Sequence, residues 1–519
     1  MRNLLTEEQS RAAETAAVAS GAVLADLMSR AGAAVAEEVA ALAPEGRIVV
    51  VAGPGNNGGD GWAAAVRMHA SGRDVLVLTS AEPDSISSPA RETVRAAIQS
   101  GVPWLHVDSG PEAAQALSEA DIIVDALLGI GLHGVPRQPY AGFIAAVGDA
   151  DGLVVSVDVP SGVDSDSGLA SGAAVAADVT VCFSAPKIGC VLQPGGSLAG
   201  DLRLVDIGIP TEALHFDGAP ELWDASDYLA CLPSPRWDDR KGTRGSVLIV
   251  GGSAGLTGAV CLAAGGALRS GAGYVAVAVP EPQLAVVEAK LTAPVKMGLS
   301  STRDGALLPA AIDEILEAAT RADVVVLGPG LGRAASTLEV VRALVARLDA
   351  PLLIDADGLY ALGSDLSLVA ARVAPTILTP HSAEAARLLG TTPEDIDSDR
   401  LSSVRALAVG GVTAVLKGPA TLVSEGGRIV VNPTGGPGLA TLGTGDVLSG
   451  IVGAWLARGL LALDAAAVGT YLHGAAGDCA ARDLTTICCT AEDVVTYLPE
   501  AVRTLMRTDD ARTRRRNAR

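Results

Sequence analysis

Short apolar runs recur along the whole chain, separated by Ala-rich or glycine-containing segments. Each run is rich in Val, Ile and Leu, as is typical of strands that are buried on both faces of a parallel sheet. The runs are residues 47–51, 74–78, 121–125, 153–157 and 179–183 in the first half, and 246–250, 274–279, 323–327, 351–354, 376–378 and 413–416 in the second. Because helical segments lie between runs, the pattern predicts an α/β protein with two doubly wound domains, the first of them Rossmann-like.

The N-terminal segment is helical in pattern, and the middle of the chain changes character. Residues 6–43 are Ala-rich with helical periodicity, and Thr6 followed by two glutamates is typical of a helix start. Residues 210–242 bring together Pro, Trp and Asp, which indicates a connection between domains. We therefore predict a domain at residues 1–215, a linker at 216–240, a second domain at 241–505 and a disordered basic tail at 506–519.

Composition and charge narrow the class of protein. Hydrophobic residues make up 49% of the chain and aromatic residues only 3%, so the core must be built from aliphatic side chains. The net charge of −21 disfavours nucleic-acid binding, which needs a basic surface. The seven cysteines show no metal-ligand spacing, as expected of reduced thiols in a cytoplasmic protein. The N-terminus lacks the pattern of a signal peptide, and we expect no membrane span.

The stretch GGPGLATLGTGDVLSG, residues 435–450, leads into an apolar helical run. Glycines let a backbone approach a ligand closely, and a helix start attracts phosphate through its unpaired N–H groups. Asp446 lies at this helix start. Its carboxylate could be a helix cap, or it could be a general base that takes a proton from a hydroxyl beside a bound phosphate.

A second glycine-rich segment, AGPGNNGGDGWAAAV, follows the first predicted strand and matches the pattern G-x-G-x-x-G. The match is weak evidence for a dinucleotide site, because the next strand ends in Thr79 and Ser80 without a ribose-binding acid. The asparagines and Asp60 in the loop favour a site with polar side chains of its own. Asp125, Asp158 and Lys187 also follow predicted strands, at the sheet edge where ligands bind in such folds.

Two sets of motifs carry a specific resemblance. From about residue 246 to 497 the chain resembles the NAD(P)H-hydrate dehydratase branch of the ribokinase-like superfamily, through VLIVGGSAGLTGA, VLGPGLG, IDADGL, LTPHSAEAARLLG, LKGPATLV and GLATLGTGDVLSG. From about residue 5 to 210 it resembles NAD(P)H-hydrate epimerases, through GPGNNGGDG, VDALLGIGL, VDVPSGVD and FSAPKIG. Together the matches are those of bifunctional NAD(P)H-hydrate repair enzymes.

The resemblance implies a repair reaction. Water adds to the nicotinamide ring of NADH or NADPH and gives a 6-hydroxy hydrate as two epimers. The N-terminal domain would interconvert the R and S forms. The C-terminal domain would phosphorylate the S form at the expense of ADP or ATP with Mg²⁺ and then eliminate phosphate, a far better leaving group than hydroxide.

The resemblance also implies roles for residues of the C-terminal domain. Asp446 would be the catalytic base, and the N–H groups of Thr444 and Gly445 would stabilise the transferred phosphate. The nucleotide-binding set is Lys417, Gly418, Pro419, Ala420, Thr421, Thr444 and Gly445. The substrate-binding set is Ala259, Gly332, His381 and Asp446.

In the N-terminal domain the resemblance implies substrate contacts and a potassium site. The substrate-binding set is Asn56, Asn57, Gly58, Gly59, Asp60, Gly129, Ile130, Gly131, Leu132, His133, Gly134, Val135 and Asp158. Asn57, Asp125 and Ser161 match the potassium ligands, and all three offer the oxygen donors that a hard cation requires. An acid–base role for Asp158 is our own hypothesis.

Some positions depart from the family's usual motifs, and alternatives remain. Leu128 and Ile130 replace a phenylalanine and a threonine, Ser382 and Ala383 replace a Pro-Gly pair, and Gly436 replaces an asparagine. A small-molecule kinase fused to a non-catalytic nucleotide-binding module is the main alternative. We expect a homo-oligomer without nucleic-acid or membrane partners. The number of subunits, the preference between ADP and ATP, and the preference between NADH and NADPH hydrates stay open.

Overall fold

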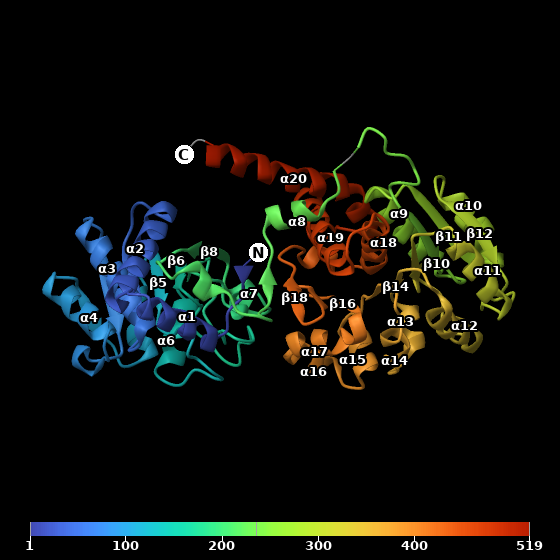
Figure 1. Cartoon of the computed structure of the whole chain (residues 1–519). Coiled ribbons are helices and arrows are strands. Elements are labelled where there is room, and N and C mark those ends of the chain that lie inside the picture. The colour runs from blue at the N-terminus through green and yellow to red at the C-terminus, as the bar shows by residue number, and fades with distance from the viewer. Residues whose placement is uncertain (1, 235, 518–519) are drawn as a thin grey trace. The chain divides into compact units, whose positions relative to one another are not determined.

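The computed structural model describes residues 2–234 and 236–517. The chain divides into two compact units, one at Arg2–Pro220 and one from Glu221 onward (Figure 1). Both units are α/β with mainly parallel sheets, which confirms the predicted fold class. None of the helices described has both the length and the apolar character needed to cross a membrane.

The N-terminal unit is built on a parallel sheet in the order β4-β3-β2-β5-β6-β7-β8. The strands are β2 (Ile48–Ala52), β3 (Val75–Thr79), β4 (Trp104–His106), β5 (Ile122–Ala126), β6 (Leu153–Val157), β7 (Val179–Phe183) and β8 (Asp201–Val205); a short β1 (Arg2–Asn3) starts the unit. The helices are α1 (Glu7–Ala19), α2 (Leu24–Leu42), α3 (Asn56–Ala70), α4 (Ala90–Gln99), α5 (Gly110–Leu117), α6 (Tyr140–Gly148) and α7 (Gly195–Leu198).

Alternation along the strands assigns side chains to two core layers. In β2, Val49 and Val51 pack with α5 and α6, whereas Ile48, Val50 and Ala52 pack with α2, α3 and α4. Consecutive side chains of a strand point to opposite faces, so a run that is apolar at every position needs helices on both sides. The strand order reverses between β2 and β5, and in such sheets ligands bind outside the carboxyl ends at this switch point.

The C-terminal unit is also built on a single sheet, in the order β9-β18-β17-β16-β15-β14-β13-β10-β11-β12. The strands are β9 (Glu221–Leu222), β10 (Ser246–Val250), β11 (Tyr274–Pro280), β12 (Val295–Leu299), β13 (Val324–Leu327), β14 (Leu352–Ile354), β15 (Thr376–Leu378), β16 (Thr413–Leu416), β17 (Leu422–Glu425) and β18 (Arg428–Val431). The run from β12 to β16 is parallel, and β17 is antiparallel to both of its neighbours.

Helices α9, α18, α19 and α20 share one apolar core with the strands of this sheet. The helices of the unit are α8 (Ala225–Cys231), α9 (Thr257–Arg269), α10 (Leu284–Lys290), α11 (Ala310–Ala319), α12 (Ala335–Arg347), α13 (Asp357–Leu362), α14 (Ser367–Ala370), α15 (Ser382–Leu389), α16 (Pro393–Ser398), α17 (Arg400–Leu407), α18 (Thr444–Ala457), α19 (Ala462–Leu484) and α20 (Ala491–Asn517). Small residues let α18 approach α9 closely, since a Cβ on Gly450 would lie 1.9 Å from the carbonyl oxygen of Ala263.

The structure differs from the expected segmentation in three places. A turn at residues 20–23, with Gly21 at φ 103°, divides the helical segment 6–43 into α1 and α2. Part of the expected linker is ordered, because β9 and α8 belong to the second unit. Helix α20 continues to Asn517 through most of the expected disordered tail, of which residues 518 and 519 lie outside the described part.

Candidate active sites

The glycine loop of the N-terminal unit connects β2 to α3 and starts the candidate epimerase site. Residues 56–60 form the first turn of α3, whose capping position Gly55 provides no side-chain hydrogen bond. A Cβ on Gly58 would lie 1.9 Å from the carbonyl oxygen of Gly53, so this turn can close only around glycine. The free N–H groups of the helix start therefore face the sheet edge without a protein cap.

A network of oxygen atoms joins the predicted potassium ligands beside this loop. Ser161 Oγ donates to Asp125 Oδ1 over 2.6 Å, and the Ser161 N–H donates to Asp125 Oδ2 over 2.9 Å. The Asn57 amide donates to the carbonyl oxygen of Leu128 over 2.9 Å, and Ser161 Oγ lies 3.1 Å from the same oxygen. Burial raises the pKa of Asp125, while the hydrogen bonds from Ser161 and Ser156 oppose the rise. The structure thus brings Asn57, Asp125 and Ser161 together.

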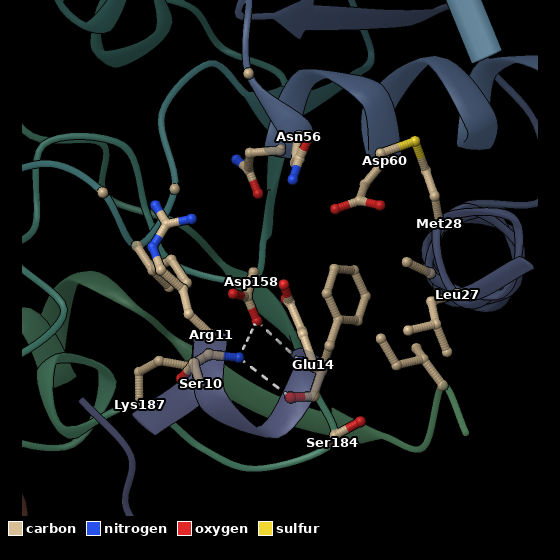
Figure 2. Close-up of a pocket in the computed structure, with 18 of the residues that line it drawn as sticks. Ser10, Arg11, Glu14, Leu27, Met28, Asn56, Asp60, Asp158, Ser184 and Lys187 are labelled. Atoms are coloured by element: carbon tan, nitrogen blue, oxygen red, sulfur yellow. Dashed lines mark hydrogen bonds and ion pairs between the residues drawn. The ribbon is translucent and has the colours of Figure 1, made fainter. Parts of the chain in front are cut away.

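A cavity of about 430 Å³ opens over the sheet edge of this unit (Figure 2). Of the predicted substrate-binding residues, those that line it are Asn56, Asn57, Asp60, Gly129, Ile130, Gly131, Leu132 and Asp158. Gly58 and Gly59 are buried in α3 and support the loop. His133, Gly134 and Val135 are exposed and do not line the cavity.

His133 instead anchors the loop that carries residues 129–135. Its Nε2 lies 2.7 Å from Glu7 of α1 and its Nδ1 lies 3.1 Å from Asp164. These two carboxylates raise the pKa of His133, the Asp164 hydrogen bond being the larger cause. The histidine therefore holds one wall of the cavity against α1 without entering it.

The floor of the cavity holds a buried ion pair between Asp158 and Lys187. Asp158 has φ 63°, a conformation that is strained for a residue with a Cβ. Its Oδ1 accepts from the Lys187 ammonium and, over 3.0 Å, from the N–H of Phe183. Burial opposes the charge of Lys187, but the Asp158 carboxylate raises the pKa of its ammonium. These contacts give Asp158 Oδ1 two donors, one of them a buried ammonium.

Two further carboxyl groups point into the same cavity, Asp60 from α3 and Glu14 from α1 (Figure 2). Burial raises the pKa of Asp60 well above its usual range, and the Asp158 carboxylate adds to the rise. The same two causes raise the pKa of Glu14, against the opposing effect of Lys187. The cavity thus combines a lysine-paired carboxylate with two carboxyl groups whose pKa is raised by burial and by that carboxylate.

In the C-terminal unit the glycine-rich stretch ends at the start of α18. Gly443, at φ 94°, occupies the capping position, and Asp446 is the third residue of the helix. The hypothesis that Asp446 caps this helix is wrong, because Gly443 holds the capping position and no side chain of the described residues caps α18. The hydroxyl of Thr444 donates to the carbonyl oxygens of Leu439 and Thr441 over 3.0 Å. His473 Nε2 lies 2.9 Å from the carbonyl oxygen of Thr444, and burial lowers the pKa of His473 to about 4.

Asp446 shares its surroundings with a buried lysine–aspartate pair. Lys417 Nζ lies 2.8 Å from Asp355 Oδ1 and 3.8 Å from Glu384 Oε2. The hydroxyl of Ser449, one turn along α18, donates to the other oxygen of Asp355. Burial raises the pKa of Asp446 to about 7, the Asp355 carboxylate adds to the rise, and Lys417 opposes it. A carboxyl group poised near neutrality at a helix start can act as a general base.

The remaining predicted residues of this unit lie on the loops after its parallel strands. Ala259 is in the first turn of α9, and a Cβ on Gly330 would lie 3.1 Å from its Cβ. Gly332, at φ 76°, donates its N–H to Asp357 Oδ2 over 2.9 Å. Residues 418–421 form the turn between β16 and β17, where Thr421 Oγ1 donates to the carbonyl oxygen of Gly418 over 2.9 Å.

His381 caps α15 through a reciprocal arrangement. Its Nδ1 accepts from the N–H of Ala383 over 3.2 Å, while its own N–H donates to Glu384 Oε2 over 3.0 Å. This is a capping box in which a histidine takes the place of the usual serine or threonine. The imidazole is largely exposed, so its Nε2 faces solvent and Glu384.

Family models and relatives match both units. The family model described as "YjeF-related protein N-terminus" matches residues 24–189, and that described as "NAD(P)H-hydrate dehydratase" matches residues 247–500. The chain is 40% identical over 467 residues to a bifunctional NAD(P)H-hydrate repair enzyme of Moorella thermoacetica, covering 88% of each chain. It is 37% identical to a relative of the same description from Thermofilum pendens, covering 92% of each. The chain belongs to the family of bifunctional NAD(P)H-hydrate repair enzymes.

Among solved structures, the chain is similar to an ADP/ATP-dependent NAD(P)H-hydrate dehydratase from Bacillus subtilis that was crystallised with ATP and Mg²⁺. The TM-score is 0.48 at 28% identity, and the match covers 55% of this chain and 98% of that one. The family membership itself rests on the relatives that match both units, and it confirms the predicted resemblance.

Several residues of the two candidate sites, or the contacts that they make, could not be predicted from the sequence motifs. Glu14 and Arg11 line the N-terminal cavity from α1, a helix that carried no recognised motif. Asp355 lies inside the motif IDADGL, where no role was predicted for it, and the structure shows its contact with the Lys417 ammonium. Lys187 was predicted at the ligand-binding sheet edge, but its contact with the Asp158 carboxylate was not. Ser449 lies inside the stretch GLATLGTGDVLSG, but only the structure shows its hydrogen bond to Asp355.

Proposed function

We propose that the N-terminal unit interconverts the R and S hydrates of NADH and NADPH, and that the C-terminal unit dehydrates the S hydrate at the expense of ADP or ATP. The observation that carries the proposal is that one chain matches this family over both of its units. The acidic residues with the required chemistry, Asp158 and Asp446, lie at the carboxyl edges of the two sheets.

In the C-terminal unit Asp446 would remove the proton of the 6-hydroxyl as its oxygen attacks the terminal phosphorus. The pKa of about 7 lets the carboxylate exist near neutral pH and still accept a proton. The N–H groups of Thr444 and Gly445 would bind the transferred phosphate, and Lys417, beside Gly445, would offset its charge. The phosphate then leaves with the electrons of its bond to carbon 6, and the loss of a proton from carbon 5 restores the ring.

The residues near Asp446 fit a nucleotide with Mg²⁺. Glu384 offers a carboxylate of the kind Mg²⁺ prefers, 3.8 Å from the Lys417 ammonium. When bound, Mg²⁺ would neutralise part of the charge on the phosphates. The turn at residues 417–421 would bind the nucleotide, and Ala259, Gly332 and His381 would contact the hydrate.

In the N-terminal unit the free N–H groups of the first turn of α3 would hold the phosphates of the hydrate. Asp158, at the floor of the cavity, would act at the hydrated ring. Asn57, Asp125 and Ser161 together with the Leu128 carbonyl form an all-oxygen set that fits K⁺. When bound, K⁺ would supply fixed positive charge beside the loop and balance Asp125. We further propose that the chain acts in the cytoplasm as a homo-oligomer.

The K⁺ assignment predicts a stabilisation that is specific to this cation. We expect K⁺ to raise the melting temperature of the N-terminal unit, or its epimerase rate, relative to a bulky organic cation at equal ionic strength, because ligand binding to the native state stabilises it. The measurement is thermal unfolding and epimerisation in the two salts, with Ser161→Ala as the variant that should lose the difference. Identical values in both salts would refute the site.

The fate of phosphate separates the proposal from a small-molecule kinase. Purified chain, pure S hydrate of NADPH and ADP or ATP with Mg²⁺ are incubated, and NADPH absorbance and inorganic phosphate are followed together. The proposal predicts equal yields of NADPH and phosphate. A phosphorylated product that accumulates without NADPH would favour the kinase. In a second arm, the R hydrate without nucleotide should become an R/S mixture faster than in buffer alone.

A further inference from the structure

Helix α1 delivers a carboxyl group, Glu14, into the N-terminal cavity from the side opposite to the strand motifs. Ser10 and Arg11 precede Glu14 by four and three residues, so both lie on the same face of the helix as Glu14. All three residues line the cavity. Figure 2 shows Glu14 beside Asp158, with Asp60 farther along the cavity wall. A capping box between Thr6 and Gln9 fixes the start of α1, and Glu7 binds His133 of the neighbouring loop. The position of Glu14 is thus defined by the fold.

The charged groups around Glu14 are one buried ion pair, one further carboxyl group and one arginine that is paired elsewhere. Asp158 and Lys187 form the buried pair, Asp60 faces the same space from α3, and Arg11 is engaged by Glu7 over 2.7 Å. In the part of the chain that the structure describes, no hydrogen bond occupies the Glu14 carboxyl. Burial and then the Asp158 carboxylate raise the pKa of Glu14, so its proton is retained to higher pH than usual. Asp158, in contrast, accepts at Oδ1 from the Lys187 ammonium and from the N–H of Phe183.

We propose that Glu14 is a second catalytic residue of the N-terminal site, the acid that labilises the hydroxyl of the hydrate; this inference rests on the epimerase function proposed above. Asp158 is paired with a lysine, whereas the Glu14 carboxyl beside it has no hydrogen-bond partner among the described residues. Two carboxyl groups in such different surroundings can divide an electrostatic and an acid role between them. The substrate class is a ring that carries a hydroxyl on a carbon next to nitrogen.

The proposed step conserves all atoms and charges. Glu14 gives its proton to the 6-hydroxyl, the carbon–oxygen bond breaks with both electrons on oxygen, and water leaves. The lone pair of the ring nitrogen forms a second bond to carbon 6, and the lysine-paired Asp158 carboxylate stabilises the resulting cation. A water molecule then adds to the other face of carbon 6, and its surplus proton returns through water to the Glu14 carboxylate. The cycle ends with the opposite epimer and a protonated Glu14.

Asp60 is the competing candidate for the acid. It lies in the first turn of α3, next to the asparagines that would hold phosphates, whereas Glu14 lies beside Asp158. Asp60→Asn is therefore included in the test as the variant that should change the Michaelis constant more than the pH profile. Glu8→Gln, an exposed carboxylate on the same helix, is the matched control.

The test uses the full chain and the pure R hydrate of NADPH without nucleotide, with spontaneous epimerisation subtracted. Glu14→Gln should lower the epimerisation rate by about 10²–10⁴-fold, the usual contribution of a positioned acid. The wild-type rate should fall as pH rises through the pKa of Glu14, and this fall should vanish in Glu14→Gln, reappear in Glu14→Asp and persist in Glu8→Gln. In ¹⁸O-water the S hydrate should gain solvent oxygen.

Three outcomes overturn the inference while leaving the proposed function intact. These are a wild-type rate in Glu14→Gln, loss of the pH dependence in Asp60→Asn instead, and an S hydrate without solvent oxygen. A wild-type thermal unfolding transition of the N-terminal unit in Glu14→Gln serves as the folding check. A wild-type chain that fails to accelerate epimerisation would instead reject the proposed function.

Discussion

Two lysine–aspartate pairs set the chemistry of the two sites in different ways. Lys187 binds Asp158 directly, whereas Lys417 binds Asp355 and leaves Asp446 nearby with a pKa of about 7. A directly paired carboxylate is a fixed charge, while an unpaired and partly buried one can exchange its proton near neutral pH. The same residue types therefore support an electrostatic role in one unit and a base role in the other.

Replacing Asp446 with Asn should abolish the base without removing a cap. We expect dehydratase turnover to fall by about 10²–10⁴-fold, with nucleotide binding retained. The pKa of Asp446 is raised from its ordinary value of 3.8 to about 7 in the native state, so its ionisation destabilises the native state as pH rises through this range. The variant lacks this carboxyl group and should therefore be more stable than wild type above pH 7. Turnover and thermal unfolding at pH 8 are the measurements. Normal turnover, or a stability loss of about 1 kcal/mol as for a lost cap, would contradict the assignment.

The neighbours of Asp446 predict opposite shifts of its pH profile. Turnover should rise with pH through about 7, because the base must be ionised. Asp355→Asn removes a negative neighbour and should move this rise to lower pH. Lys417→Met removes a positive neighbour and should move it to higher pH. The two predicted shifts are tested by measuring the turnover of S hydrate at saturating nucleotide across pH for both variants. Shifts of the pH profile in the same direction would be inconsistent with this electrostatic account.

At the scale of elements, each site depends on a glycine turn between a strand and a helix. The turn from β2 to α3 closes because Gly53 and Gly58 lack side chains, and the turn into α18 needs the positive φ of Gly443. The sequence predicted both turns and most of the strands, since glycine spacing and continuous apolar runs are local signals. It did not predict β4, β8, β12, β17 or β18, which lie toward the ends of their sheets and carry mixed polar and apolar residues.

The turn into α3 offers a matched pair of substitutions. Gly58→Ala places a Cβ 1.9 Å from the carbonyl oxygen of Gly53, so the turn must open and move the asparagines of the site. Gly55→Ala meets no atom within 4 Å and has an ordinary φ of −94°. We expect Gly58→Ala to lower the melting temperature and to abolish epimerisation, and Gly55→Ala to keep the wild-type melting temperature. Equal melting temperatures for the two variants would show that the turn tolerates a side chain at residue 58.

At the scale of the whole molecule, the chain carries two folded units with one candidate site each. Glycine and acidic motifs marked residues of both sites in the sequence, because they sit on short loops after strands. Glu14 could not be recognised in this way, since nothing in an Ala-rich helix reveals which strand edge it packs against. His381 has a second role that its motif did not reveal, because its Nδ1 caps α15 while its Nε2 stays exposed for the predicted ligand contact.

The most direct test of the account is the recovery of NADPH from a mixed R/S hydrate with ADP or ATP and Mg²⁺. The wild-type chain should convert both epimers completely, whereas Asp158→Asn should convert the S form rapidly and the R form only at the spontaneous rate. Asp446→Asn should recover NADPH about 10²–10⁴-fold more slowly than wild type, yet keep the two epimers in equilibrium. If wild-type recovery also stops when the S form is consumed, or if Asp158→Asn completes the reaction at the wild-type rate, the division of labour between the two units is wrong.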